Sequence, residues 1–314
     1  MKKSLKISLA LAVCLVLVFA AFAACKLYDY ARWNLYLINE KLDYIKTNGE
    51  NMLQYAQRGR FDTERYDFDY SWLEQDEPLL ISHALGGIDE LAYTNSREAM
   101  ELAYKNGLRV FEADIQMLDG DILLLHDLAA AGESCGLEEG FGSEEYLASR
   151  IHGKYTQMSW QDVLDFMAEH PDVYLVTDTK YNQQPYMSYA ISALTAQTAE
   201  YDAALLDRLI IQIYSQQMLD VVMDIYPFKS VIYTLYLSED NNGEVADFCQ
   251  RSGVGAVTMS KHRHSQELVD LLGSMGVHSL IHTINDPQQA ALMSESGMSG
   301  LYTDFLTPAD FAQG

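Results

Sequence analysis

The chain has 314 residues, of which 49% are hydrophobic and 21% are charged, enough for one large core. Lysine and arginine total 21 against 45 aspartates and glutamates, so the formal net charge is −24. Such a charge repels nucleic acid, and because no basic stripe interrupts it we expect no nucleic-acid partner. The cysteines form no CxxC or Cys/His pattern, which excludes a structural zinc site.

Residues 1–25 are predicted to be an N-terminal membrane anchor or signal segment. Three lysines precede an apolar run from Ile7 to Ala24, which approaches the length of a spanning helix and starts in the cytoplasm. An uncleaved single anchor is favoured, because the run is long for a signal-peptide core of about 7–15 residues. Cleavage after Ala23 and lipidation at Cys25 stay open as alternatives. All three interpretations place the rest of the chain outside the cytoplasm, at the cell membrane or secreted.

Residues 26–78 are rich in Tyr, Asp, Glu and Asn, with apolar residues at loose helical spacing. They predict a juxtamembrane helical stalk that leads into the main domain. Cys135 and Cys249 are the cysteines that fall in the exported domain. That compartment permits a disulfide between them, although their spacing does not indicate one.

From residue 79 to residue 314, short apolar segments alternate with amphipathic helices. The predicted strands are Leu79–His83, Arg109–Ile115, Val173–Asp178, Leu209–Tyr214, Val231–Leu235, Ala256–Met259, His278–Thr283 and Gly300–Asp304. The predicted helices are Ser96–Lys105, Ser159–Glu169, Tyr186–Glu200, Gln216–Ile225, Glu244–Arg251, Gln266–Met275 and Pro287–Glu295. This alternation predicts an α/β fold, a (β/α)₈ TIM barrel of about 250 residues or fewer. A doubly wound sheet would give the same order, but no GxGxxG sequence follows the first strand.

Two further segments lie after the second predicted strand. Ile122–His126 follows an Asp119-Gly120 turn and is expected to form a hairpin with that strand. The stretch 128–158 is rich in Gly and Glu and is expected to be a loop over the mouth of the barrel.

Ionisable residues stand at the ends of several predicted strands, and the carboxyl ends of barrel strands meet at one face. Two acidic residues on the second strand are two positions apart, so both side chains point to the same side. That strand is otherwise apolar, and buried acidic groups must be paired or coordinated. The candidate site residues are His83, Glu112, Asp114, His126, Asp178 and Lys180.

These residue types suit chemistry on a phosphodiester. Oxygen ligands without a thiolate favour Mg²⁺ or Ca²⁺, so we expect one divalent cation bound by Glu112, Asp114 and Asp178. One of the two imidazoles, His83 and His126, would remove a proton from the nucleophile while the other protonates the leaving oxygen. The ammonium group of Lys180 would stabilise charge on the substrate phosphate.

The order of short motifs resembles that of a known family. The sequence contains His83-Ala84, Thr94-Asn95-Ser96, Glu112-Ala113-Asp114, Asp119-Gly120 with His126-Asp127, Asp178-Thr179-Lys180, Thr283-Ile284-Asn285 and Thr303-Asp304. This set is similar to the signature of the glycerophosphodiester phosphodiesterases, in the phospholipase C-like TIM-barrel superfamily. The resemblance implies hydrolysis of a small-molecule or lipid-derived phosphodiester, with the same acid–base histidines, metal ligands and phosphate-contacting lysine.

The sequence also departs from that signature. Ala84 stands where the family signature has an Arg after its first histidine, so a bidentate contact with the phosphate is missing. His282 replaces the Trp of the late motif, and Asp178 replaces a Glu. Asp-x-Lys at this place resembles the sphingomyelinase D-type branch of the superfamily. Two alternatives therefore stay open, a phospholipase D- or C-like lipid phosphodiesterase and a barrel that binds a phosphodiester without turnover.

Overall fold

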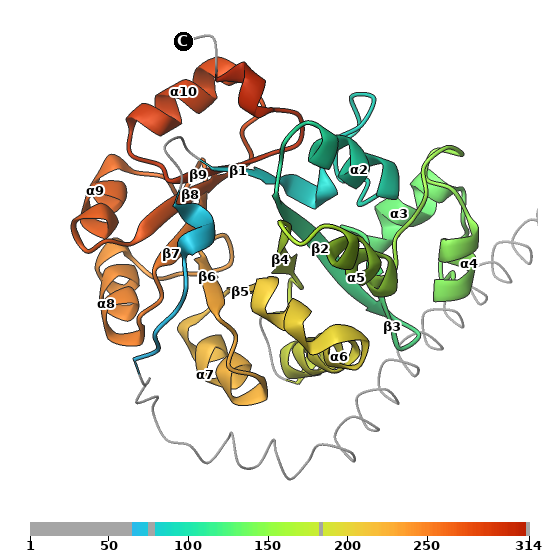
Figure 1. The fold of residues 1–314 in the computed structure, drawn as a ribbon, viewed down its shortest axis with the longest axis horizontal. Helices are drawn as coiled ribbons and strands as arrows, with labels where there is room; N and C mark the ends of the chain where they lie inside the picture. Colours follow the sequence, from blue (N-terminus) through green and yellow to red (C-terminus); the bar gives the residue numbers. More distant parts are fainter. Residues whose placement is uncertain (1–64, 75–78, 182–184, 312–314) are drawn as a thin grey trace, which may run out of the picture. The chain divides into compact units, whose positions relative to one another are not determined.

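The computed structural model describes residues 65–74, 79–181 and 185–311, and Figure 1 shows that they form a closed barrel with helices around it. The parallel strands are β1 (Leu79–Ser82), β2 (Val110–Leu118), β4 (Tyr174–Asp178), β5 (Leu209–Ile213), β6 (Ser230–Thr234), β7 (Ala256–Ser260), β8 (His278–His282) and β9 (Gly300–Thr303). Each pairs with the strands beside it, and β1 pairs with both β2 and β9, which closes the sheet. The predicted (β/α)₈ barrel is confirmed.

Helices follow the strands and cover the outside of the barrel (Figure 1). They are α2 (Arg97–Lys105), α5 (Trp160–Glu169), α6 (Tyr186–Asp202), α7 (Gln216–Ile225), α8 (Asn242–Ser252), α9 (Gln266–Ser274) and α10 (Pro287–Glu295), with the short 3-10 helices η3 (Ala203–Arg208) and η4 (Pro308–Asp310). The sequence specifies the starts of α2, α5, α8, α9 and α10 with N-cap side chains that accept hydrogen bonds from the first turn. Ser159 and Asp162 form a capping box on α5, and Asn241 and Glu244 form one on α8. The predicted helices are confirmed to within a few residues.

The predicted anchor, residues 1–25, and most of the predicted stalk lie outside the described residues. Among the helices that are described, none is long and apolar enough to cross a membrane.

The stretch after β2 differs from the prediction. Strand β3 (Asp121–Leu124) does pair with β2 in an antiparallel hairpin, as expected. The following residues, however, form helices α3 (Leu128–Cys135) and α4 (Ser143–Ala148) rather than a loop over the mouth. Tyr146 and Phe141 pack with the apolar side chains of the hairpin in a cluster of their own. The prediction was wrong because these apolar residues are spread thinly among the Gly and Glu that dominate the composition.

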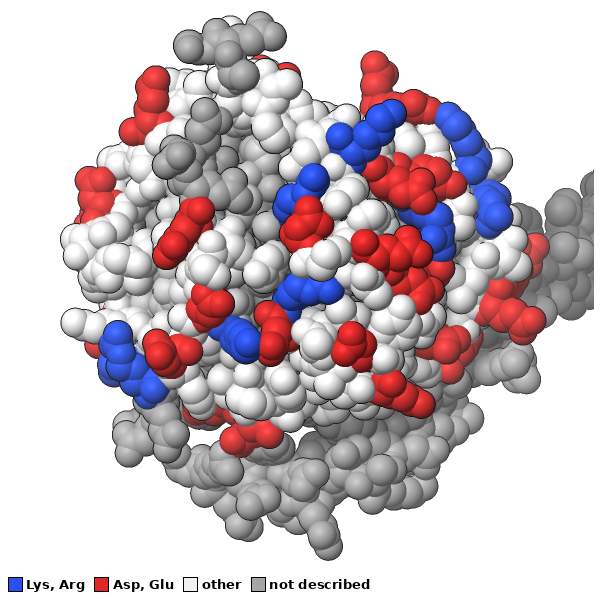
Figure 2. Space-filling model, viewed as in Figure 1, with Lys and Arg blue, Asp and Glu red and all other residues white. Residues whose placement is uncertain are grey.

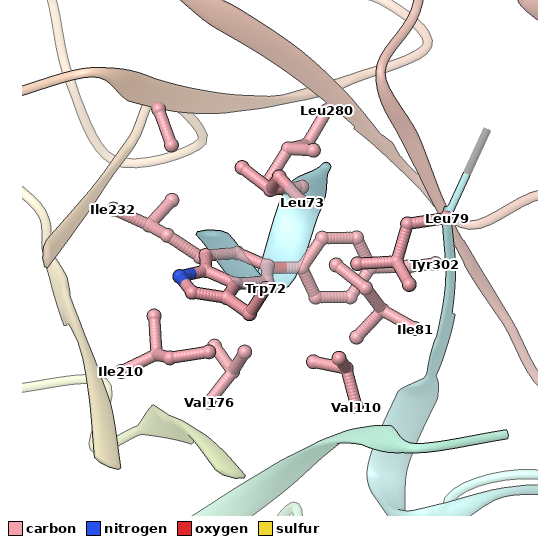
Figure 3. Close-up of a cluster of buried hydrophobic side chains, with 11 residues drawn as sticks. Trp72, Leu73, Leu79, Ile81, Val110, Val176, Ile210, Ile232, Leu280 and Tyr302 are labelled. Atoms are coloured by element: carbon pink, nitrogen blue, oxygen red, sulfur yellow. The ribbon is translucent and has the colours of Figure 1, made fainter. Parts of the chain in front are cut away.

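The lower end of the barrel is filled by a layer of apolar side chains, the basal layer. In Figure 3, Trp72 of the single-turn helix η1 (Ser71–Leu73) lies among residues contributed by the strands, including Val110, Val176 and Ile210. The stalk predicted for residues 26–78 includes this segment. Trp72 and Leu73 are instead 6% and 4% exposed, so this segment is part of the barrel core.

The strands place polar residues one step above the basal layer. Because side chains alternate along a strand, the residue two positions after the last basal residue of each strand also faces inward. All of these positions are polar, and they form the polar layer: His83, Glu112, Asp178, Gln212, Thr234, Thr258, His282 and Asp304. The apolar floor therefore supports a ring of hydrogen-bonding and ionisable groups at the carboxyl ends of the strands.

The outer surface mixes charges of both signs. Figure 2 shows acidic and basic side chains interspersed on one face of the molecule. Some are ion pairs, such as Arg109 with Asp172 at 2.6 Å and Lys229 with Asp207 at 2.7 Å. Cys135 and Cys249 are both free thiols, so the disulfide that the compartment would permit is not formed.

Candidate active site

Three carboxylates, Glu112, Asp114 and Asp178, converge in the polar layer and just above it. One oxygen from each lies within 4.8 Å of the others, and all three side chains are buried. We call this group the acidic cluster. Burial and the charge of Asp114 raise the pKa of Glu112 to about 8, which shows that the cluster as it stands opposes full ionisation.

Glu112 is satisfied on one oxygen and unsatisfied on the other. Its Oε2 accepts a hydrogen bond of 2.7 Å from the backbone N–H of Ala84, in the single-turn helix η2 (His83–Leu85). Its Oε1 is buried and has no hydrogen-bond partner among the described residues. Ala84 has a left-handed backbone (φ 48°), which turns its N–H toward Glu112. The residue that replaces the family's Arg thus contributes to the site through its backbone.

Asp114 is held by Asn95, which lies before helix α2. The Asn95 amide donates to Oδ2 of Asp114 at 2.9 Å, and its Oδ1 accepts from the Asp114 backbone N–H at 3.1 Å. Asn95 is fully buried and has a left-handed backbone (φ 46°). Asparagine tolerates that conformation better than most residues, so backbone and side chain both specify it here.

Lys180 and Tyr214 hold the third carboxylate. The Lys180 ammonium contacts Asp114 and lies 3.1 Å from Oδ2 of Asp178. The Tyr214 hydroxyl donates to Asp178 and accepts from the Lys180 backbone N–H at 2.9 Å. Burial alone would lower the pKa of Lys180, but the charges of Asp114, Asp178 and Glu112 hold it above its ordinary value. Lys180 is therefore a cation bound inside the acidic cluster.

His83 is paired with Asp304, which follows the last strand. Its Nδ1 lies 2.8 Å from Oδ1 of Asp304, and the other Asp304 oxygen accepts from the Asn285 amide at 2.6 Å. Burial lowers the pKa of His83, but the hydrogen bond to Asp304 and the charges of Glu112, Asp304 and Asp114 outweigh it and raise the pKa to about 9. The imidazole is thus held in its charged form near neutral pH.

His126 lies after the β2–β3 hairpin and is exposed. The ring of Tyr93 links it to His83. The Tyr93 centroid is 4.8 Å from that of His83 and 4.7 Å from that of His126, with interplanar angles of 81° and 65°. The two predicted acid–base histidines therefore flank one aromatic side chain.

His282 belongs to the same polar layer but differs in charge from His83. Burial, together with the nearby positive charges of His83 and Lys261, lowers its pKa to about 4. Its Nε2 is buried without a hydrogen-bond partner in the described part of the chain. His282 is therefore a neutral ring that lines the site.

The comparisons with known proteins agree with this geometry. The model of the glycerophosphoryl diester phosphodiesterase family matches residues 86–307. The chain belongs to this family. As a member it is a phosphoric diester hydrolase, a glycerophosphodiester phosphodiesterase in type. Among curated proteins, no relative matches the chain.

Solved structures give the same fold at low sequence identity. A glycerophosphodiester phosphodiesterase from Parabacteroides distasonis has a TM-score of 0.61 at 16% identity, covering 76% of this chain and 97% of that one. One from Galdieria sulphuraria has a TM-score of 0.61 at 15% identity, covering 76% and 98%. A phosphodiesterase from Oleispira antarctica, solved with the product sn-glycerol-3-phosphate, has a TM-score of 0.59 at 16% identity, covering 73% and 93%.

The donor set of this phosphodiesterase fits a divalent metal ion. The acidic cluster offers carboxylate oxygens and no sulfur, which suits a hard cation. Oε1 of Glu112, which has no hydrogen-bond partner in the described part of the chain, is a buried acceptor that a cation would satisfy. Positive charge placed there would also remove the repulsion that raises the pKa of Glu112.

Several supporting residues were named in the sequence only as motif positions or not at all. Asn95, Asn285 and Asp304 had been matched to motifs without a role, and Tyr93 and Tyr214 had not been singled out. Closure of a barrel places the last strand beside the first, and Ser82 pairs with Thr303. That rule alone would have brought Asp304 next to His83. No comparable signal marks Tyr93, which contacts the histidines from a loop.

Proposed function

We propose that the protein hydrolyses a glycerol phosphodiester with His83 and His126 as its acid–base pair and one divalent cation, Mg²⁺ or Ca²⁺. The observation that carries the proposal is the convergence of Glu112, Asp114 and Asp178 within 4.8 Å, together with two histidines whose rings contact the same tyrosine. Family membership supports the reaction class. A bound divalent cation would polarise a phosphoryl oxygen and offset developing negative charge.

The two histidines differ in a way that suggests separate roles. Asp304 holds His83 protonated, so His83 is suited to donate a proton to the leaving alkoxide. His126 then accepts the proton of the attacking hydroxyl or water. Lys180 would contact a non-bridging phosphoryl oxygen, which requires its ammonium to exchange its contact with Asp114 for one with the substrate.

Turnover by the full-length chain in detergent tests the reaction. We expect hydrolysis of glycerophosphoglycerol that EDTA abolishes and that Mg²⁺ or Ca²⁺ restores. Faster hydrolysis of a lysophospholipid than of glycerophosphoglycerol would instead indicate a phospholipase D- or C-like enzyme that acts on lipids. No chelator-sensitive turnover of any phosphodiester would contradict the proposal.

An activated substrate tests the roles of the histidines. Nitrophenolate leaves without a proton, so His83→Ala should lower kcat on a nitrophenyl phosphodiester by less than about tenfold but lower it by about 10²-fold or more on glycerophosphoglycerol. His126→Ala should impair both substrates alike. Equal losses for His83→Ala on the two substrates would contradict the assignment of His83 as the acid.

We also propose that residues 1–25 tether the protein to the cell membrane, or export it, and that the rest of the predicted stalk, up to residue 64, leads from there to the catalytic domain outside the cytoplasm. The lysines and apolar run at the start of the chain support this placement. Protease added to intact spheroplasts should digest the catalytic domain of the expressed full-length chain. Protection until the membrane is lysed would contradict it.

A further inference from the structure

Tyr93 is the one side chain among the described residues whose ring contacts both His83 and His126. Its centroid lies 4.8 Å from one imidazole and 4.7 Å from the other, within the range of favourable edge-to-face contacts. Tyr93 is 47% exposed, so part of it is open to solvent beside the two histidines.

The loop that carries Tyr93 is fixed from both sides. Tyr93 has a left-handed backbone (φ 60°), as does Asn95 two residues later, whose amide is bonded to Asp114. Thr94 and Ser96 are buried and their hydroxyls are 2.9 Å apart, and the Ser96 hydroxyl accepts from the first turn of α2. The position of the Tyr93 ring is thus set by the same residues that set the position of a metal ligand.

His126 has little else to orient it. It is exposed and follows a short hairpin strand. The next residue, Asp127, caps α3 with its side chain. His83, in contrast, is fixed through Asp304. A ring that touches both can transmit the fixed position of the first imidazole to the second.

We propose that Tyr93 is a positioning residue that holds the His83 and His126 imidazoles at their working separation through its ring, not its hydroxyl. The Tyr93 hydroxyl makes no hydrogen bond within residues 65–74, 79–181 and 185–311, which supports the distinction. This inference rests on the proposed function of the two histidines.

Kinetics of Tyr93 variants in the full-length chain test the inference. Tyr93→Phe keeps the ring and should retain kcat within about threefold, whereas Tyr93→Ala should lower kcat by about 10–100-fold with little change in KM, since small misplacements of reacting groups have such effects. Tyr201→Ala, at another exposed tyrosine (38%) on α6, is the matched control and should leave kcat unchanged. Thermal unfolding confirms that each variant is folded.

The outcomes separate this inference from its alternatives. Equal loss of kcat in Tyr93→Phe and Tyr93→Ala would overturn it, because the hydroxyl would then be the acting group. A rise in KM alone would also overturn it, because the ring would then bind substrate. Histidine side-chain NMR gives a readout that does not need turnover. Tyr93→Ala should shift the ring resonances of both His83 and His126, and unchanged resonances would overturn the inference even if the proposed function holds.

If the wild-type chain proves inactive on every phosphodiester, the proposed function fails, and the NMR comparison still decides whether the Tyr93 ring contacts the two imidazoles.

Discussion

Glu112 lies in surroundings that favour function over stability. Within the described residues, one of its oxygens is buried without a hydrogen-bond partner, and an oxygen from each of two further carboxylates lies within 4.8 Å of its carboxylate. A neutral amide at this position would relieve the repulsion and could donate a hydrogen bond to the acidic cluster. Proteins commonly lose some folding stability at sites that are arranged to bind a charged ligand.

The substitution Glu112→Gln is therefore expected to stabilise the metal-free protein by about 1–2 kcal/mol at pH 8 while lowering kcat by at least ~10²-fold. Thermal unfolding in EDTA measures the first effect, and an assay with added Mg²⁺ or Ca²⁺ measures the second. In wild type, the added ion should raise the melting temperature more than in the variant. A lower melting temperature for metal-free Glu112→Gln would refute this account.

The pairing of His83 with Asp304 predicts a pH dependence of stability. The pKa of His83 is raised from an ordinary value of about 6.5 to about 9 in the folded state. Its contribution to the free energy of unfolding is therefore fully present below about pH 6.5 and lost as pH rises through about 9. In Asp304→Asn, burial would dominate and the pKa of His83 would fall.

The difference in free energy of unfolding between wild type and Asp304→Asn should thus be about 2–3 kcal/mol larger at pH 6 than at pH 9.5, measured by urea unfolding in EDTA. NMR titration of the imidazole gives the pKa directly. A constant difference across this pH range would mean that Asp304 does not hold the His83 proton.

At the scale of elements, the segment between η2 and α2 holds the Asp114 carboxylate in place through Asn95. Asn95 combines a left-handed backbone with two hydrogen bonds to Asp114, and these two contributions can be separated. Asn95→Gly keeps the backbone conformation and removes the hydrogen bonds. Asn95→Ala removes both.

We expect both variants to weaken metal binding by about 10–100-fold, as substitutions of outer-shell partners do. Only Asn95→Ala should also lose about 1 kcal/mol of stability from the backbone, relative to Asn95→Gly. Calorimetry with Ca²⁺ or Mg²⁺ and urea unfolding measure the two effects. Unaltered metal affinity in Asn95→Gly would show that Asp114 needs no support from this turn.

The elements that sequence predicted well are those with strong periodicity. The barrel strands and the helices between them were placed to within a few residues, because parallel strands are continuous apolar runs and the helices have clear caps. The acidic cluster followed from strand alternation at Glu112 and Asp114. Helices α3 and α4 and the contact of Tyr93 with the histidines were missed, since both depend on packing between segments that have no periodic pattern.

At the scale of the whole molecule, the barrel is closed at its base by a residue outside the repeating units. Trp72 precedes β1 and fills the basal layer from below (Figure 3). Trp72→Ala should lower the free energy of unfolding by about 3–5 kcal/mol, as for other buried aromatic residues. Because Trp72 is a full layer away from the acidic cluster, kcat of the folded enzyme at low temperature should change little. Chemical unfolding and kinetics at the same temperature check both, and a large loss of kcat with unchanged stability would contradict this division.

The base of the barrel and the site above it also limit the number of ions that the protein can hold. When all are ionised, the acidic cluster and the Lys180 ammonium together carry two negative charges, and His83 and Asp304 cancel each other. One divalent cation would bring the net charge of these groups to zero. The apolar basal layer offers no charged group to balance a second cation. The expected stoichiometry is therefore one ion per chain. A phosphodiester anion then arrives at a site that is neutral as a whole, where the Lys180 ammonium can exchange its contact with Asp114 for one with the phosphate.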